Sequence, residues 1–274
     1  MLDTSLERSL GDTQWSVDLT HATINQDERD NDAHAHIAAR HRLTTLAIEG
    51  EIDGVLWTLA IPRVERLLTV TSTGATTQHN GLGDLVLTAR VPWNSLGIIC
   101  GVKMATGESD GNLGAVSRRY LQMGTGSTDL IVGVRAETQG ENEGAAAFVQ
   151  LTGQAAVASD DTFRPGTTVA LTAGFRQPIN SELALTLQGS VLRQYRDKNT
   201  ERLVNAAYSE DLETSVLSVS VTPGIAWTPN KATSVHFHVT EPLMDKNYAT
   251  RPQGGISNPI HSSRVVAVGV TRRF

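Results

Sequence analysis

The chain has 274 residues and a formal net charge of −6, with 29 acidic and 23 basic residues. This acidic balance argues against nucleic acid as a partner, because nucleic-acid-binding surfaces are basic. The single cysteine, Cys100, excludes an internal disulfide and a cysteine metal cluster. Hydrophobic residues make up 39% of the chain, and no apolar run reaches the ~18 residues of a membrane helix.

Alternation of apolar and polar side chains predicts twelve β-strands. They are expected near residues 13–23, 36–48, 53–67, 82–92, 95–105, 126–137, 144–157, 166–177, 181–194, 214–227, 232–241 and 264–274. Residues 1–12 form a polar lead, and residues 13–274 form one β domain without a helix or a linker. The lead has no signal segment of basic and then apolar residues. If the protein is exported, we expect the numbering to begin after removal of a signal peptide. If it is cytoplasmic, no signal peptide is needed.

The predicted connections alternate between short and long. Residues 49–51 are expected to form a tight turn, whereas residues 69–81, which are rich in Thr, Ser and Gly, are expected to form a longer loop. Pro62 lies inside the third strand and predicts a bulge or the end of regular pairing, because proline cannot donate a ladder hydrogen bond. Short periplasmic turns on one rim and longer extracellular loops on the other are typical of an even-numbered transmembrane barrel.

The last predicted strand, at 264–274, has one apolar face and one small or polar face. The apolar face carries Val266, Val268, Val270 and Phe274, and the other face carries Ala267, Gly269, Thr271 and Arg273. Ten residues tilted by about 45° are long enough to cross a bilayer. The strand resembles the closing strand of bacterial outer-membrane barrels, in which the terminal Phe is read by the insertion machinery. Arg272 departs from that pattern and could snorkel to the head groups. The alternative is the last strand of a soluble sandwich.

Five aromatic residues are expected at strand ends on the short-turn rim. They are Trp15, Trp93, Phe175, Trp227 and Phe274. Such a girdle is typical of the membrane interface. Together with the loop lengths, it predicts an all-β fold: a single transmembrane antiparallel β-barrel of about twelve strands, surrounded by lipid in the bacterial outer membrane.

If the apolar strand faces point to lipid, the opposite faces line the lumen. The predicted lumenal residues are Arg40, Arg42, Arg90, Lys103, Asp129, Arg135, Glu137, Gln150, Arg176 and Gln188. Arg40 and Arg42 are included because an arginine facing lipid at mid-depth costs about 2–4 kcal/mol. The cations would bias the lumen toward anions. The alternative is that they fill the barrel in ion pairs with Asp18, Asp129 and Glu137.

Three glycine-containing sequence segments, at residues 81–87, 101–107 and 124–130, resemble segments of one known family. This is the outer-membrane transporter-like family named for the meta pathway of phenol degradation. The resemblance covers roughly residues 80–274 and is most specific over 81–135, although Ala105 stands where the family typically has Pro. It implies a barrel with a role in passing small molecules across the outer membrane. It supplies no active-site motif.

Two functional classes therefore stand ahead of a third. The first is a channel or porin for small solutes, with aromatic or anionic solutes as candidates. The second is a structural barrel that encloses or anchors another envelope protein, such as an electron-transfer partner. An outer-membrane phospholipase is disfavoured because the chain lacks the compact motif with His and Ser that ends in Ser-Asn-Gly. Residues 255–259 resemble this motif only superficially. We expect no enzyme activity.

Two histidine pairs and one acidic loop are the other candidates for chemistry. His34 and His36 share a strand face, as do His236 and His238, and each pair could supply two metal ligands of the three or more that zinc needs. Polar residues on a solvated face are the commoner case. The loop acids Asp27, Glu28, Asp30 and Asp32 could bind divalent cations, but acidic loops are usually only solvated. No metal or cofactor is predicted.

Overall fold

The structure of the chain is a computed structural model. It describes residues 15–28, 37–70, 74–109, 122–139, 145–159, 163–199, 214–249 and 264–274. The predicted lead at 1–12 and the segment 255–259 lie outside the described residues, as do Asp30, Asp32, His34 and His36.

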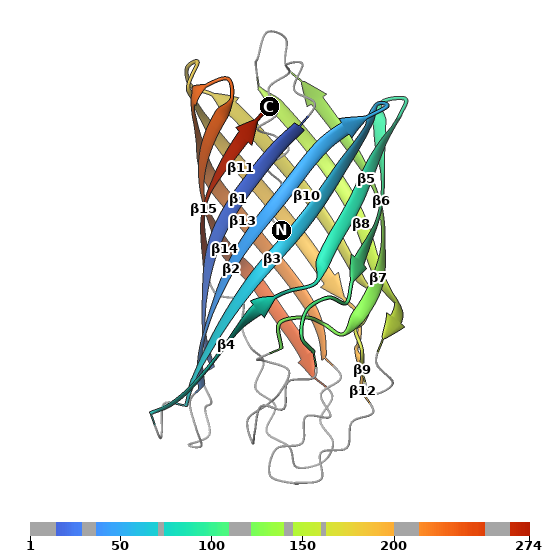
Figure 1. The fold of residues 1–274 in the computed structure, drawn as a ribbon, viewed down its shortest axis with the longest axis vertical. Helices are drawn as coiled ribbons and strands as arrows, with labels where there is room; N and C mark the ends of the chain where they lie inside the picture. Colours follow the sequence, from blue (N-terminus) through green and yellow to red (C-terminus); the bar gives the residue numbers. More distant parts are fainter. Residues whose placement is uncertain are drawn as a thin grey trace.

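The described residues form β-strands that follow one another around a barrel (Figure 1). The strands of the barrel are β1 (Trp15–Glu28), β2 (Ile37–Ile52), β3 (Val55–Val70), β4 (Ala75–Leu82), β5 (Leu85–Trp93), β6 (Leu96–Met104), β7 (Ser127–Gln139), β8 (Ala146–Ser159), β10 (Thr168–Pro178), β11 (Leu183–Gln194), β13 (Thr214–Asn230), β14 (Thr233–Ala249) and β15 (Val265–Arg273). Two short strands, β9 (Phe163–Arg164) and β12 (Lys198–Asn199), pair only with each other. Within the described part of the chain, no helix has the length and hydropathy that a membrane crossing requires.

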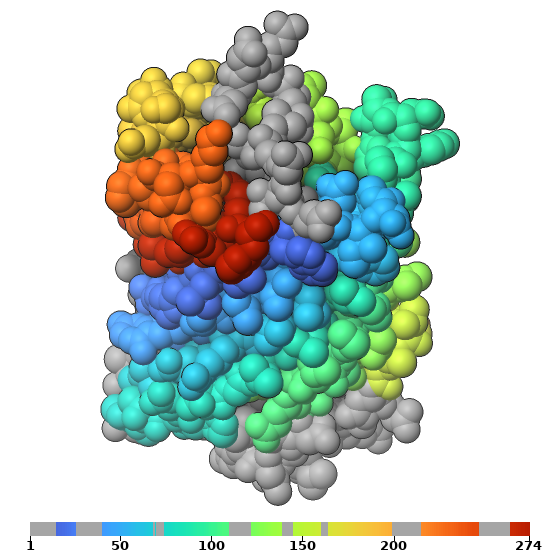
Figure 2. Space-filling view, turned by 45° about the horizontal axis from the view of Figure 1, so that its top comes forward, coloured from blue at the N-terminus to red at the C-terminus, as the bar shows by residue number. Residues whose placement is uncertain are grey.

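The barrel closes because the last strand pairs with the first. β15 pairs antiparallel with β1 from Ser16↔Arg273 to Ile24↔Val265. β2 in turn pairs with both β1 and β3. In the space-filling view the red C-terminal strand lies between orange β14 and dark blue β1 (Figure 2). Since β4 and β5 are two parts of one interrupted strand, the described residues form a closed antiparallel barrel of twelve strands, and the predicted fold is confirmed.

The interruption between β4 and β5 lies opposite Pro62. β3 pairs with β5 up to Ala60↔Val86 and with β4 from Arg63↔Leu82, so the register shifts by one residue. Pro62 has no N–H for the ladder, and its carbonyl accepts a hydrogen bond from Gly83 N at 2.8 Å. Of the two outcomes predicted for Pro62, a bulge or the end of regular pairing, the end of regular pairing is confirmed. The loop predicted at 69–81 is wrong, because β3 continues to Val70 and β4 begins at Ala75.

Side chains alternate between an exposed apolar face and a buried face. On β7 the exposed fractions of Leu130, Val132 and Val134 are 52%, 54% and 41%. On β15 the predicted faces are confirmed, because Val268 is 47% exposed whereas Ala267, one residue away, is 1% exposed. A closed barrel with an exposed apolar face of this kind matches the lipid-facing surface of a membrane barrel.

The five predicted girdle residues are all exposed on the outer face. Trp15 begins β1, Trp93 ends β5 and Phe274 follows β15, and these ends lie with the short β2–β3 and β5–β6 connections at the top of Figure 1. The tight turn predicted at 49–51 is wrong, because β2 continues to Ile52 and the turn is formed by Asp53 and Gly54, with φ angles of 52° and 77°. Gly50 lies instead beneath the ring of Trp15, where a Cβ would overlap the ring. Because Gly50 has no side chain, the ring of Trp15 can pack against its backbone at the rim.

Candidate functional site: the barrel lumen

Most of the predicted lumenal residues lie on the inward faces of their strands. On β7 they alternate with exposed apolar residues, as Asp129 and Arg135 do with Leu130 and Val134. The residues placed inward are Arg90, Lys103, Asp129, Arg135, Glu137, Gln150, Arg176 and Gln188.

Arg40 and Arg42 are on the outer face instead. Arg42 lies beside Thr23 in the ladder, and Thr23 lies beside Val266, which is 41% exposed on the outer face. The ladder places Arg40, two residues away, on the same face, where its Nε donates to Asn25 Oδ1 at 3.2 Å. The expectation assumed that both arginines lie at mid-depth in the membrane. They lie in the part of β2 nearest the long-loop rim, where an outward arginine costs little.

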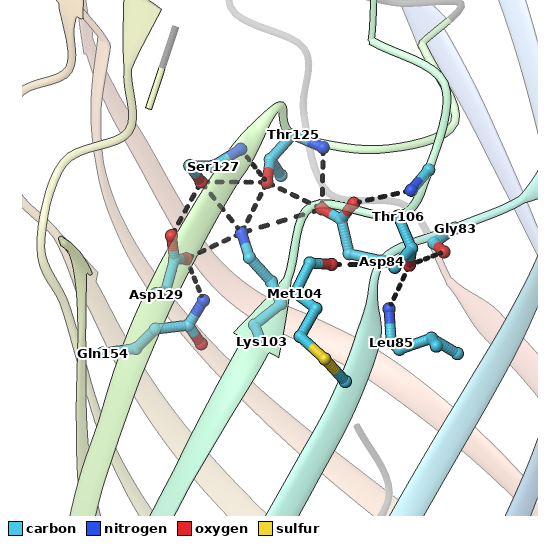
Figure 3. A network of polar contacts seen from close by, with 11 residues as sticks. Gly83, Asp84, Leu85, Lys103, Met104, Thr106, Thr125, Ser127, Asp129 and Gln154 are labelled. Carbon is cyan, nitrogen blue, oxygen red and sulfur yellow. Dashed lines mark hydrogen bonds and ion pairs between the residues drawn. The ribbon is translucent and has the colours of Figure 1, made fainter. Parts of the chain in front are cut away.

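Six polar residues meet where β4 and β5 are interrupted (Figure 3). We call them the Asp84 cluster: Asp84, Lys103, Thr125, Ser127, Asp129 and Gln154. The Lys103 ammonium lies 2.7 Å from Asp129 Oδ2 and 3.8 Å from Asp84 Oδ2. It also donates to the hydroxyls of Thr125 and Ser127 at 2.5 Å and 3.2 Å. Lys103, Asp84 and Asp129 are all buried, so the lysine is enclosed between two carboxylates rather than free in the lumen.

Asp84, which lies at the interruption between β4 and β5, accepts hydrogen bonds from two other segments of the chain. Its Oδ1 accepts from Gly107 N at 3.1 Å, and its Oδ2 accepts from Thr125 N and Thr125 Oγ1 at 2.8 Å and 2.7 Å. Gly107 and Gly124 pack backbone to backbone, since a Cβ on Gly107 would lie 2.6 Å from Gly124 Cα. The glycines are therefore required by the close approach of the two segments. Each of the three sequence segments that carry the family resemblance contributes one of these residues: Asp84, Gly107 and Thr125. The sequence alone did not indicate that the three segments are in contact.

A second set of charges lies closer to the short-turn rim. Glu137 Oε2 accepts from Arg90 Nη1 at 2.8 Å and from Arg135 Nε at 2.9 Å. Arg135 Nη1 also donates to Gln150 Oε1 at 3.2 Å, and its guanidinium lies 3.9 Å from the ring centroid of Phe148. These contacts fix Arg135, which is 2% exposed, against the barrel wall.

His236 and His238 also face inward, and they were not among the predicted lumenal residues. Their ring centroids are 5.2 Å apart. His236 Nε2 lies 3.2 Å from Thr20 Oγ1 and 3.8 Å from Asp18 Oδ2. Among the described residues, no group of three or more His, Cys, Asp or Glu side chains is placed to hold a metal ion.

Large inward side chains lie flat over glycines on the neighbouring strand. A Cβ on Gly269 would overlap the ring of His236, and a Cβ on Gly174 would overlap the ring of Phe148. A Cβ on Gly97 would lie 2.9 Å from Arg90 Cδ. In the sequence, these contacts could have been predicted only from glycines on inward strand faces, because a glycine leaves room for a bulky side chain on the neighbouring strand.

We expect Gly269→Val to lower the free energy of unfolding by about 1–3 kcal/mol, because overpacking displaces the His236 ring. The matched control is Gly189→Val on β11, where the nearest atom to an added Cβ is Ser220 O at 4.0 Å. The unfolding midpoint of the purified protein in detergent is the measurement. Equal midpoints for the two variants would contradict the role of Gly269.

Comparison with known proteins supports the architecture. No protein-family model and no curated protein matches the chain. Among solved structures, it is similar to an outer membrane channel from Pseudomonas putida, with a TM-score of 0.67, 12% identity and 100% coverage of both chains. The fold is that of an outer-membrane β-barrel. The toluene transporter TodX of P. putida has a TM-score of 0.51 at 9% identity, covering 97% of this chain and 91% of TodX. The translocator domain of the autotransporter NalP from Neisseria meningitidis has a TM-score of 0.50 at 13% identity, covering 98% and 91%. At these identities the likeness shows the fold.

Proposed function

We propose that this protein is an outer-membrane channel that passes small solutes through its lumen. The observation that carries the proposal is the position of the large inward side chains, which lie over glycines of the neighbouring strand. Phe148 over Gly174 and His236 over Gly269 are two examples. A barrel of twelve strands is wider than the eight-stranded barrels that side chains fill completely. Flattened side chains in a barrel of this size favour a path for solutes.

We infer small solutes with an anionic or aromatic group as the cargo. Arg90 and Arg176 on the inward faces are less buried than Arg135 and would attract a carboxylate. The proposed family, named for the meta pathway of phenol degradation, agrees with such a cargo. Membership of that family is supported by the hydrogen bonds of Asp84, which join the three sequence segments that resemble the family. Phe274, which is 73% exposed at the end of the chain, is proposed as the residue read by the insertion machinery.

The test of the channel is conductance of the purified protein alone in a planar bilayer. Its mobility in electrophoresis should change on heating in detergent, which reports a folded barrel. A folded barrel should then give stepwise conductance, and liposomes that contain it should admit benzoate faster than an uncharged sugar of similar size. A heat-modifiable protein without conductance would reject the channel, and the structural barrel that encloses a partner would replace it.

A further inference from the structure

Three arginines form a patch on the outside of the barrel wall. The patch, which we call the outer arginine patch, consists of Arg40 and Arg42 on β2 and Arg63 on β3. All three are exposed. Arg63 lies opposite Thr44 in the ladder, so it shares the outer face of Arg42, two residues away along β2. The patch is therefore separate from the lumen and from its charges.

The depth of the patch follows from the strand geometry. Gly50 lies beneath Trp15 at the short-turn rim, and Arg42 is eight residues further along β2. At about 3.3 Å per residue and a tilt of about 40°, these residues span about 20 Å of height, against an apolar band about 25 Å tall. Arg42 thus lies near the outer edge of the apolar band. Long arginine side chains at this level reach the head groups.

The charge of the patch is only partly balanced by its neighbours. Arg42 Nη1 pairs with Glu65 Oε1 at 3.2 Å, and the side chain of Arg42 is 45% exposed. Within the outer arginine patch and its ion-pair partner Glu65, three arginines and one glutamate leave a net charge of +2. A guanidinium has five N–H donors, and the contacts to Glu65 and Asn25 engage one nitrogen of Arg42 and one of Arg40. Donors remain for an anion at the head-group level.

We propose that the outer arginine patch binds the phosphate groups of a phosphorylated glycolipid in the outer leaflet of the membrane. Arginine is suited to phosphate because its planar fork can donate two parallel hydrogen bonds. The apolar wall continues below the patch toward the short-turn rim, where Leu19 is 52% exposed, so the acyl chains of the same lipid would lie against it. Free phosphate would gain nothing from that apolar surface. The site is independent of solute transport through the lumen.

The experiment titrates the purified barrel in detergent with bisphosphorylated lipid A and measures bound lipid by native mass spectrometry. We expect the double variant Arg42→Gln/Arg63→Gln to bind about tenfold more weakly or worse than the unmodified protein. This loss corresponds to removing charge-assisted hydrogen bonds to phosphate. The matched control, Arg272→Gln/Arg273→Gln, removes the same charge at the short-turn rim and should bind normally. A heat-modifiable band verifies that both variants are folded.

Dephosphorylated lipid A and inorganic phosphate are the two comparison ligands. Unmodified protein should bind dephosphorylated lipid A as weakly as the double variant binds the phosphorylated lipid. Equal binding of the two lipids would show that acyl chains alone determine affinity, and would overturn the proposal. Inorganic phosphate bound as tightly as the lipid would also overturn it, in favour of a free-anion site. Equal losses in the control variant would mean that total charge, and not the patch, decides binding.

Discussion

Lys103→Gln is expected to lower the free energy of unfolding by about 3–5 kcal/mol, the typical cost of breaking a buried ion pair. The ammonium lies 2.7 Å from Asp129 and 3.8 Å from Asp84, and the three side chains are 9%, 4% and 7% exposed. Glutamine would leave two carboxylates close together in a site that excludes water. The midpoint of urea unfolding in detergent micelles is the measurement.

A double-mutant cycle distinguishes a lost ion pair from a general packing defect. Lys103→Gln/Asp129→Asn removes one charge of each sign, so it should destabilise the barrel less than the sum of the two single variants by about 0.5–3 kcal/mol. The surface control is Arg42→Gln, which breaks an exposed pair with Glu65 and should cost about 0–1 kcal/mol. If Lys103→Gln is as stable as the unmodified protein, the lysine does not hold the cluster together.

Strand alternation made the barrel predictable, and its limits explain the errors. The closing strand from Val265 to Arg273 alternates strictly, so its faces were correct. β4 has no such signal, because its sequence, ATTQHNGL, is mostly polar on both faces. The same limit misplaced Arg40 and Arg42, since near water an arginine can occupy either face of a strand.

The faces of the lumenal charges could be predicted, but their partners could not. A period of two decides whether a residue points inward, and this is a local property. Pairing depends on the register between distant strands: Asp84 and Thr125 are 41 residues apart, and Asp18 and Thr271 are 253 residues apart. Lys103 was therefore assigned to the lumen from its strand face alone. Its enclosure between two carboxylates favours the barrel-filling alternative for this residue.

The remaining lumenal charges are divided between two sides of the barrel. Arg90, Arg135 and Arg176 come from β5, β7 and β10. Asp18 on β1 and Glu49 on β2 face inward from another part of the wall, since Glu49 pairs in the ladder with the buried Ser16. Together with Glu137, these three acids balance the three arginines, and the charges of inward Arg66 on β3 and inward Asp245 on β14 cancel each other. We therefore expect the unmodified channel to discriminate only weakly between the small ions of a salt such as KCl, while a carboxylate solute is oriented toward the arginine side.

This near balance makes single charges decisive for ion selectivity. Glu137→Gln should raise the anion-to-cation permeability ratio about several-fold at low salt, and Arg90→Gln should lower it, because each variant unbalances a field that low-dielectric walls focus. Reversal potentials in a KCl gradient measure both shifts, and heat-modifiable mobility verifies the fold. The control is Glu65→Gln, which alters an outer-face acid that pairs with Arg42 and should leave the ratio unchanged. Both shifts should shrink in concentrated salt, since the screening length falls from ~30 Å at 0.01 M to ~3 Å at 1 M. Shifts of the same sign in the two variants would mean that Arg90 and Glu137 do not face the ion path, and the conducting route would have to pass elsewhere.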